Sequence, residues 1–305
     1  MSTATGLVEL RDETGALAWI RPDLGGWLLR YARPIPGRGL IEALRYDPAV
    51  VDRYPKEMWA GNPLLFPHVS FNVAGELEGQ YELNGTIYHS VQHGFGRRVP
   101  WRAVAVTGNS VTLELTEGPD TLPSYPFRFC HRVTYTLTGG RLSLRQTVTN
   151  TDAAPLPFST GIHPYLSLPL HPDSSRAQCH LRLPRCTRFN PVGKCEAFFS
   201  EPVAAQNWPV TRDVSTALFF GEFAEKEIAL VDPAAGVEVV VNFADSPDYR
   251  YAALWSRNSE APFYCIEPWT ALPNSFGRGE ADLTILPPGA SFQAHLWLDV
   301  RSASQ

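Results

Sequence analysis

Apolar and polar residues alternate along much of this sequence, and this period-two pattern constrains the fold more than any other feature. Residues 133–137 and 142–148 alternate on either side of Gly139-Gly140. Two alternating runs joined by a glycine pair are typical of a β-hairpin. The alternation recurs in six further segments, 8–10, 17–19, 111–115, 237–243, 283–285 and 292–300. Because each run has one apolar and one polar face, we predict antiparallel sheets with one solvated side.

Helix signals are weak by comparison. Apolar residues at i, i+3, i+4 and i+7 are not sustained, and only residues 47–58 and 215–223 leave room for a turn or two of helix. The 27 prolines outnumber the 23 glycines, and proline interrupts helices and central strands alike. No repeat or linker-like change of composition divides the 305 residues. We therefore predict an all-β fold, a large antiparallel β-sandwich with few short helices, in which residues 1–305 form a single domain.

The charge balance and the cysteine content exclude several classes of partner and site. Lys and Arg number 26 against 31 Asp and Glu, a net charge of -5, which argues against nucleic acid as a partner because phosphate backbones bind basic surfaces. No run of 18 apolar residues predicts a membrane span, and residues 1–12 lack a signal-peptide pattern. The five cysteines are an odd number without Cys-x-x-Cys spacing, so we expect reduced thiols and no metal site. We expect a cytoplasmic protein.

Histidine is the side chain best suited to move protons at neutral pH, and four of the eight histidines stand in unusual contexts. His93 precedes a Gly-Phe-Gly segment and two arginines, His163 stands directly before a proline, and His68 follows Leu-Leu-Phe-Pro. His89 and His93 have an i, i+4 spacing, but this spacing aligns two metal ligands only on a helix, and the local pattern favours strand and turn. For each histidine, a hydrogen-bonded structural role stays open.

One carboxylate stands out. Glu267 is the single acid in the aromatic run Phe-Tyr-Cys-Ile-Glu-Pro-Trp at residues 263–269. Burial in such a run raises the pKa of a carboxyl group, which suits a general acid or base. The same pattern also fits a strand whose glutamate faces solvent, and the pattern alone leaves both interpretations open.

Four motifs, taken in order, resemble the aldose 1-epimerase (mutarotase) family, most closely its bacterial branch with a His-Gly-Phe-Ala-Arg-like motif. They are Asn-Pro-Leu-Leu-Phe-Pro at 62–67, Gln-His-Gly-Phe-Gly-Arg at 92–97, Gly-Ile-His-Pro-Tyr-Leu at 161–166 and Cys-Ile-Glu-Pro-Trp at 265–269. The resemblance spans residues 7–300. It implies a galactose mutarotase-like supersandwich, and an enzyme that interconverts the α and β anomers of a free hexose by acid/base ring opening, without a metal or an organic cofactor.

The resemblance also implies roles for residues in these motifs. Glu267 would take the proton from the C1 hydroxyl, and His163 would protonate the ring oxygen as the C1–O5 bond breaks. His93 would bind a sugar oxygen, and Arg97 would either bind sugar hydroxyls or hold Glu267 in place. Trp269, together with other aromatic residues near the motifs, would pack against the apolar face of the sugar ring.

The sequence departs from the family pattern at one position. In close relatives, the strand after the Leu-Phe-Pro motif brings an arginine into the sugar site, whereas Phe71 stands about there in this chain. His68 and Asn72 are the candidates to replace that arginine as polar contacts. The acid that holds a distal hydroxyl has three candidates, Asp213, Asp245 and Asp248.

Two alternatives on the same fold remain open. A hexose-phosphate 1-epimerase needs a basic clamp, which the arginines at positions 97, 98, 182, 185 and 188 would supply. A sugar-binding protein that has lost catalysis would explain Phe71. A glycoside hydrolase is disfavoured because it needs two opposed carboxylates, and only Glu267 has a motif around it. In each case we expect a small-molecule sugar as the ligand, and a monomer or homodimer.

Overall fold

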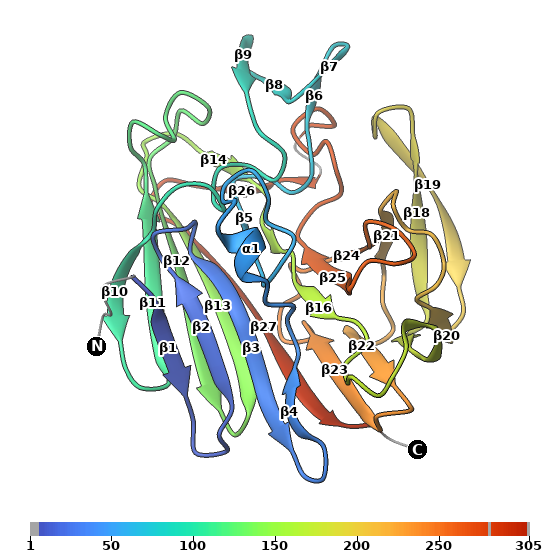
Figure 1. The fold of residues 1–305 in the computed structure, drawn as a ribbon. Coiled ribbons are helices and arrows are strands. Elements are labelled where there is room, and N and C mark those ends of the chain that lie inside the picture. The colour runs from blue at the N-terminus through green and yellow to red at the C-terminus, as the bar shows by residue number, and fades with distance from the viewer. Residues whose placement is uncertain (1–5, 280–281, 304–305) are drawn as a thin grey trace.

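The computed structural model describes residues 6–279 and 282–303, and strands make up nearly all of its regular structure (Figure 1). The largest sheet has nine strands. In spatial order they are β10 (Arg102–Val106), β11 (Ser110–Thr116), β12 (Phe129–Thr138), β13 (Arg141–Asn150), β27 (Ser291–Ser302), β23 (Val237–Asn242), β22 (Glu227–Asp232), β17 (His180–Leu183) and β20 (Gln206–Pro209). The predicted hairpin at Gly139-Gly140 is confirmed, because it joins β12 to β13.

A second sheet, of eight strands, contains strands from three of the four motifs. In spatial order its strands are β19 (Ala197–Val203), β18 (Cys186–Val192), β21 (Leu218–Gly221), β24 (Tyr251–Trp255), β25 (Phe263–Trp269), β15 (Gly161–Ile162) and β5 (Leu64–Leu65), with β16 (Tyr165–Ser167) also paired to β25. All pairings in both large sheets are antiparallel. The predicted antiparallel β-sandwich is therefore confirmed.

The remaining elements are short. A four-stranded sheet contains β1 (Val8–Arg11), β2 (Leu17–Arg21), β3 (Trp27–Ile35) and β4 (Gly39–Glu42). Three two-stranded pairs are β14 (Leu156–Phe158) with β26 (Thr284–Leu286), β6 (Val73–Ala74) with β7 (Leu77–Glu78), and β8 (Gln80–Leu83) with β9 (Thr86–His89). The described helices are α1 (Pro48–Val51) and the 3-10 helix η1 (Arg176–Gln178). Among the described residues, no helix is long and apolar enough to cross a membrane.

The two large sheets share one hydrophobic core, which the period-two pattern creates. Val133 and Tyr135 of β12 belong to the same buried cluster as Tyr264 and Ile266 of β25. The four-stranded sheet packs on the nine-stranded sheet, where the Tyr31 hydroxyl donates to the Gly140 carbonyl at 2.7 Å. Burial of these apolar faces, at roughly 25 cal/mol per Å², is the main force that holds the layers together.

The two expected helical segments have different outcomes. Residues 47–58 contain α1, whose N-terminus is capped by Asp47, since its carboxylate accepts from the Ala49 amide at 2.9 Å. The expected helical turns at 215–223 are wrong, because this segment contains β21 and the loop before it. The strand pairs with β18 and β24, so Phe220 enters the core. Sheet pairing outweighs the weak local helix preference there.

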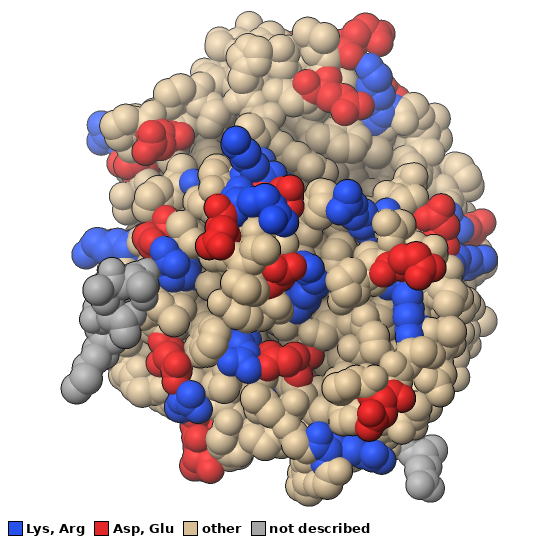
Figure 2. All heavy atoms as spheres, viewed as in Figure 1, with Lys and Arg blue, Asp and Glu red and all other residues tan. Residues whose placement is uncertain are grey.

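Charged side chains of both signs are interspersed over the face shown in Figure 2. Charged side chains also form ion pairs among the described residues, and Arg182 and Arg301 both pair with Glu238. The face in view therefore presents no field of a single sign.

The five cysteines are free thiols, and four of them are buried.

Candidate active site

Strand β25 separates the core from a cavity, because successive side chains of a strand point to opposite faces. Tyr264 and Ile266 face the core, while Glu267 and Trp269 line a cavity of about 550 Å³ on the other face. Glu267 is only 2% exposed. The open alternative of a solvent-facing glutamate is therefore wrong, and the buried interpretation holds.

His163 lies directly across from Glu267. Strands β15 and β16 both pair with β25, with Gly161 opposite Trp269 and Tyr165 opposite Cys265, so the register places His163 opposite Glu267. The His163 Nε2 lies 3.4 Å from the Glu267 Oε2. Pro164, which lacks an amide hydrogen, falls in the interruption between β15 and β16, where the sheet ladder is broken.

One hydrogen bond to the backbone of His163 and two aromatic contacts with its ring hold this residue in place. Its amide donates to the Asn62 Oδ1 at 2.9 Å, which ties the first motif to the third. Its ring stacks on the Tyr165 ring at 4.6 Å between centroids and meets the edge of Trp255 at 5.9 Å. The imidazole is thus fixed against an aromatic wall before any sugar arrives.

His93 enters the cavity from a tight loop. Its backbone has a φ of 65°, its amide donates to the Ser70 carbonyl at 2.5 Å, and its Nδ1 accepts from the Ser70 amide at 2.9 Å. An Nδ1 that accepts leaves the proton on Nε2 in the neutral ring. His93, which lines the cavity, therefore presents an Nε2–H donor there.

Gly94 is required for this loop to approach the first motif. It has a φ of 69°, and a Cβ at this position would lie 2.2 Å from the Phe66 carbonyl oxygen. Gly85, in the turn between β8 and β9, has a φ of 77° but open space around its Cβ position. The two glycines have similar φ angles and differ in the crowding around the Cβ position, so Gly85 serves as the uncrowded control.

We expect Gly94→Ala to lower the free energy of unfolding much more than Gly85→Ala. A positive φ costs an alanine about 1–2 kcal/mol at either position, and crowding at Gly94 adds roughly 1–3 kcal/mol. Denaturant titration measures both losses, and a binding assay with a hexose should show weaker binding for Gly94→Ala alone because His93 shifts. Equal losses in the two variants would contradict the crowding.

Arg97 is a buried cation with few partners. It is 8% exposed, its Nη2 donates to the Gln92 carbonyl at 3.1 Å, and its Nε has no hydrogen-bond partner. Within residues 6–279 and 282–303 it forms no ion pair. Burial lowers its pKa to about 10, so it stays charged at neutral pH. An unpaired buried charge costs stability, which is typical of a functional site.

Burial sets the protonation of the groups around Arg97. It raises the pKa of Glu267 well above 4.5, although the positive charge of Arg97 opposes this shift. It lowers the pKa of His163 and of His93 well below 6.5, and the charge of Arg97 lowers both further. Burial therefore favours the uncharged forms of both groups, a protonated Glu267 and a neutral His163, and in this state the pair holds one dissociable proton.

The cavity wall is rich in aromatic residues. Trp269 lies with its ring centroid 5.8 Å from that of His93 and 5.9 Å from that of Phe219. The lining residues are Trp59, Ser70, Phe71, Gln92, His93, Arg97, His163, Tyr165, Pro191, Gly193, Cys195, Ser215, Thr216, Ala217, Phe219, Trp255, Glu267 and Trp269. Flat apolar surfaces beside a few hydrogen-bonding groups are typical of a small-molecule site.

The structure brings five of the seven predicted site residues together and leaves two outside. His68 is fully buried, with its Nε2 in contact with the Ser90 hydroxyl, and burial lowers its pKa to about 4. The Asn72 Oδ1 accepts from the Phe276 amide at 3.1 Å. Neither residue lines the cavity, whereas Phe71 between them does. His68 and Asn72 hold neighbouring loops and have no place among the cavity contacts.

The candidates for a distal acid also lie elsewhere. Asp213 caps its own loop by accepting from the Ser215 amide at 2.8 Å, and Asp245 lies 3.5 Å from His295. Neither they nor Asp248 is among the described lining residues. Glu267 is the single acid of the described lining.

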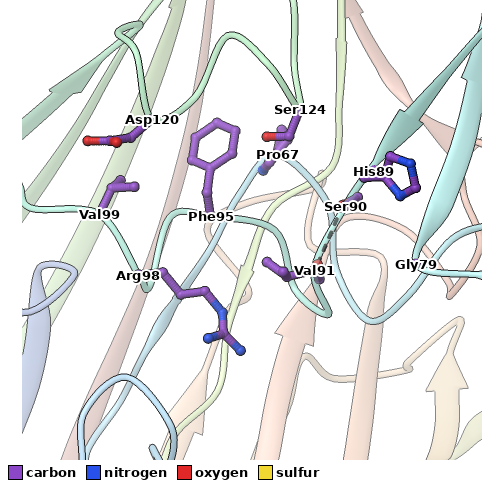
Figure 3. Close-up of a pocket in the computed structure, with 10 residues that line it drawn as sticks. All are labelled: Pro67, Gly79, His89, Ser90, Val91, Phe95, Arg98, Val99, Asp120 and Ser124. Atoms are coloured by element: carbon purple, nitrogen blue, oxygen red, sulfur yellow. Dashed lines mark hydrogen bonds between the residues drawn. The ribbon is translucent and has the colours of Figure 1, made fainter.

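A second pocket, of about 460 Å³, is lined in part by the loop of residues 92–98 (Figure 3). Phe95 and Arg98 line it together with Ser124, Asp120 and His89. It shares no lining residue with the first cavity. Arg182 and Arg185 line a third pocket. The arginines considered as a phosphate clamp are therefore divided, and only Arg97 reaches the cavity.

Sequence reasoning missed several walls of the cavity. Trp255 lies on β24, opposite Cys265 of β25, and residues 215–217 come from the loop before β21. Pro191, Gly193 and Cys195 come from the end of β18 and the turn after it. These segments carry no local motif, and strand pairing alone brings them to the site.

Comparisons with known proteins give the family. A model of the family described as aldose 1-epimerase matches residues 50–299. The LacX protein of Lactococcus lactis subsp. lactis is 26% identical over 244 residues, which cover 73% of this chain and 78% of LacX.

Solved structures give the same fold. A galactose mutarotase related enzyme from Lactobacillus acidophilus aligns with a TM-score of 0.80 and 20% identity over 98% of both chains. A galactose mutarotase-like protein from Lactobacillus casei aligns with a TM-score of 0.78 and 24% identity over 97% of this chain and 100% of that one. The segment that matches the family includes all four motifs, and we conclude that the chain belongs to the aldose 1-epimerase family.

Proposed function

We propose that this protein is an aldose 1-epimerase that interconverts the α and β anomers of a free hexose. The observation that carries the proposal is the pair of Glu267 and His163, 3.4 Å apart in a buried cavity with aromatic walls. Both the C1 hydroxyl oxygen and the ring oxygen of an aldose are bonded to C1. Two proton-transfer groups that lie side by side can therefore serve both oxygens.

The proton balance of the pair fits ring opening. Transfer of the one shared proton from Glu267 to His163 creates a carboxylate and an imidazolium. The Glu267 carboxylate then takes the C1 hydroxyl proton while the His163 imidazolium gives its proton to O5, and the C1–O5 bond breaks. Rotation about C1–C2 and closure on the other face of the aldehyde reverse these transfers. The cycle needs no net proton from solvent.

The other lining residues support this chemistry. The Nε2–H of His93 and the guanidinium of Arg97 are donors for sugar oxygens, and charged donors make stronger hydrogen bonds. The positive charge of Arg97 also favours the carboxylate form of Glu267. Trp269 and Tyr165 offer flat surfaces for the apolar face of the sugar.

The kcat/KM of mutarotation should follow a bell-shaped pH profile whose acidic limb lies below pH 6.5. The active pair holds one proton. At low pH a second proton binds to His163 and inactivates the pair, and burial keeps the pKa of His163 well below 6.5. At high pH the remaining proton leaves Glu267, and activity falls again. Burial raises the pKa of Glu267 well above 4.5, which sets this basic limb. Polarimetry across the pH range measures the profile. An acidic midpoint at or above pH 6.5 would contradict this assignment.

The phosphorylated alternative is tested by substrate choice. Arg97 is the single arginine of the described lining, and Phe71, which also lines the cavity, stands about where close relatives carry an arginine. We therefore expect a higher kcat/KM for glucose or galactose than for glucose 6-phosphate. The reverse order would move the substrate class to hexose phosphates, and sugar binding without acceleration would indicate a non-catalytic binding protein.

A further inference from the structure

A third potential ligand atom lies beside the Glu267–His163 pair. Cys265 precedes Glu267 by two residues on β25, so both side chains lie on the same face of the sheet. Cys265 is fully buried in a cluster with Tyr165 and Phe263. The ligand atoms of His163, Cys265 and Glu267 all lie within 4.8 Å of one another.

The spacing of these atoms suits a small tetrahedral ion. Three points within 4.8 Å of one another always share a point within about 2.8 Å of each. Each ligand atom would therefore have to move by at most about 0.5–0.8 Å to reach the roughly 2.0–2.3 Å found for zinc ligands. Nitrogen and oxygen ligands of a tetrahedral zinc lie about 3.4 Å apart, and the His163 Nε2 and Glu267 Oε2 are 3.4 Å apart. The Glu267 Oε2 is buried and has no hydrogen-bond partner.

The donor set selects the class of ion. Thiolate, imidazole and carboxylate are the three ligand types that zinc takes in proteins, whereas magnesium and calcium prefer oxygen alone. The cavity supplies the approach for the ion and space for a fourth ligand, because His163 and Glu267 line it. Strand pairing, rather than sequence spacing, creates the group, since His163 comes from the break between β15 and β16.

We propose that His163, Cys265 and Glu267 form a binding site for Zn²⁺ or a similar thiophilic divalent ion, and that this ion reversibly inhibits the enzyme. Binding would form bonds to the His163 nitrogen, a Glu267 oxygen and the Cys265 sulfur, and would release the thiol proton and the shared proton of the pair to solvent. An ion in this position occupies both proton-transfer groups. A bound ion would therefore inhibit the reaction and would take no part in it.

Cobalt titration tests the site without using activity. Co²⁺ added to metal-free protein should bind with one-to-one stoichiometry and produce the near-ultraviolet charge-transfer absorption of a cobalt–thiolate bond. Zn²⁺ should displace it. Cys265→Ser should lose the absorption and weaken Zn²⁺ binding by at least about 10-fold. Cys186→Ala, which removes a buried thiol away from the cavity, should leave both unchanged. Absence of one-to-one binding, or equal binding by Cys265→Ser, would overturn the proposal.

A second experiment, which rests on the proposed function, measures inhibition of mutarotation by the ion. Zn²⁺ should inhibit mutarotation competitively with the hexose, and a chelator should restore the rate. The concentration for half inhibition should rise at least about 10-fold in Cys265→Ser, measured against the uninhibited rate of that variant. Metal binding in a protein without mutarotase activity would refute the proposed function and leave the site intact. An active enzyme without thiolate-dependent binding would refute the site alone.

Discussion

Glu267→Gln is expected to lower the kcat of mutarotation by at least about 100-fold, the lower end of what a general acid or base contributes. The substitution keeps the size of the side chain but removes the group that accepts and returns the C1 hydroxyl proton. His163→Asn should cause a loss of similar size. The double variant should lose little more than either single variant, since the two groups act as one unit.

The stability of Glu267→Gln separates this role from a structural one. Because the folded-state pKa of Glu267 is raised, the folded state loses stability as the pH rises from 4.5 through that pKa. Glutamine carries no such proton. We therefore expect the Tm of Glu267→Gln at pH 8 to equal or exceed that of the wild type, by differential scanning calorimetry. A lost activity together with a much lower Tm would point to misfolding, and an unchanged kcat would refute the assigned role.

Arg97→Met is expected to lower kcat/KM by about 10- to 100-fold at neutral pH. The range corresponds to the roughly 1.5–3 kcal/mol of a hydrogen bond that involves a charged group. Arg97 lowers the pKa of both Glu267 and His163, so its removal should also shift both limbs of the pH profile to higher pH. A merely structural arginine would leave the position of the limbs unchanged.

Two controls accompany Arg97→Met. Arg97→Lys keeps the positive charge and should keep the limbs near their wild-type positions, although it loses the planar set of donors. The Tm of Arg97→Met should not fall, because methionine replaces a buried cation that has no ion-pair partner among the described residues. A pH profile of Arg97→Met that coincides with the wild-type profile would contradict the electrostatic role.

Much of the fold follows from local pattern, and the site follows only in part. The alternation in β12, β13 and β23 predicts their sheet because one face of each run is polar. Strand β25 is buried on both faces, so its sequence shows no alternation and cannot reveal which way Glu267 points. The structure supplies that direction through the pairing of β25 with its neighbours.

The differences between the residues expected at the site and the residues that line the cavity have the same physical origin. His68 and Asn72 flank Phe71 in sequence, but the backbone between them turns, and Ser70 has a φ of 54°. Ser70 and Phe71 therefore line the cavity, while His68 and Asn72 contact Ser90 and the Phe276 amide in other loops. Trp255 and the loop before β21 reach the cavity through sheet pairing over long sequence separations, which no local motif encodes.

The rate of anomer exchange tests the central claim most directly. Freshly dissolved α anomers of glucose, galactose and other free hexoses should reach equilibrium faster with the protein than without it. The acceleration should be proportional to protein concentration and absent with Glu267→Gln, as followed by polarimetry or NMR. Spontaneous rates for every hexose in the presence of protein, while calorimetry shows that a sugar binds, would contradict the account.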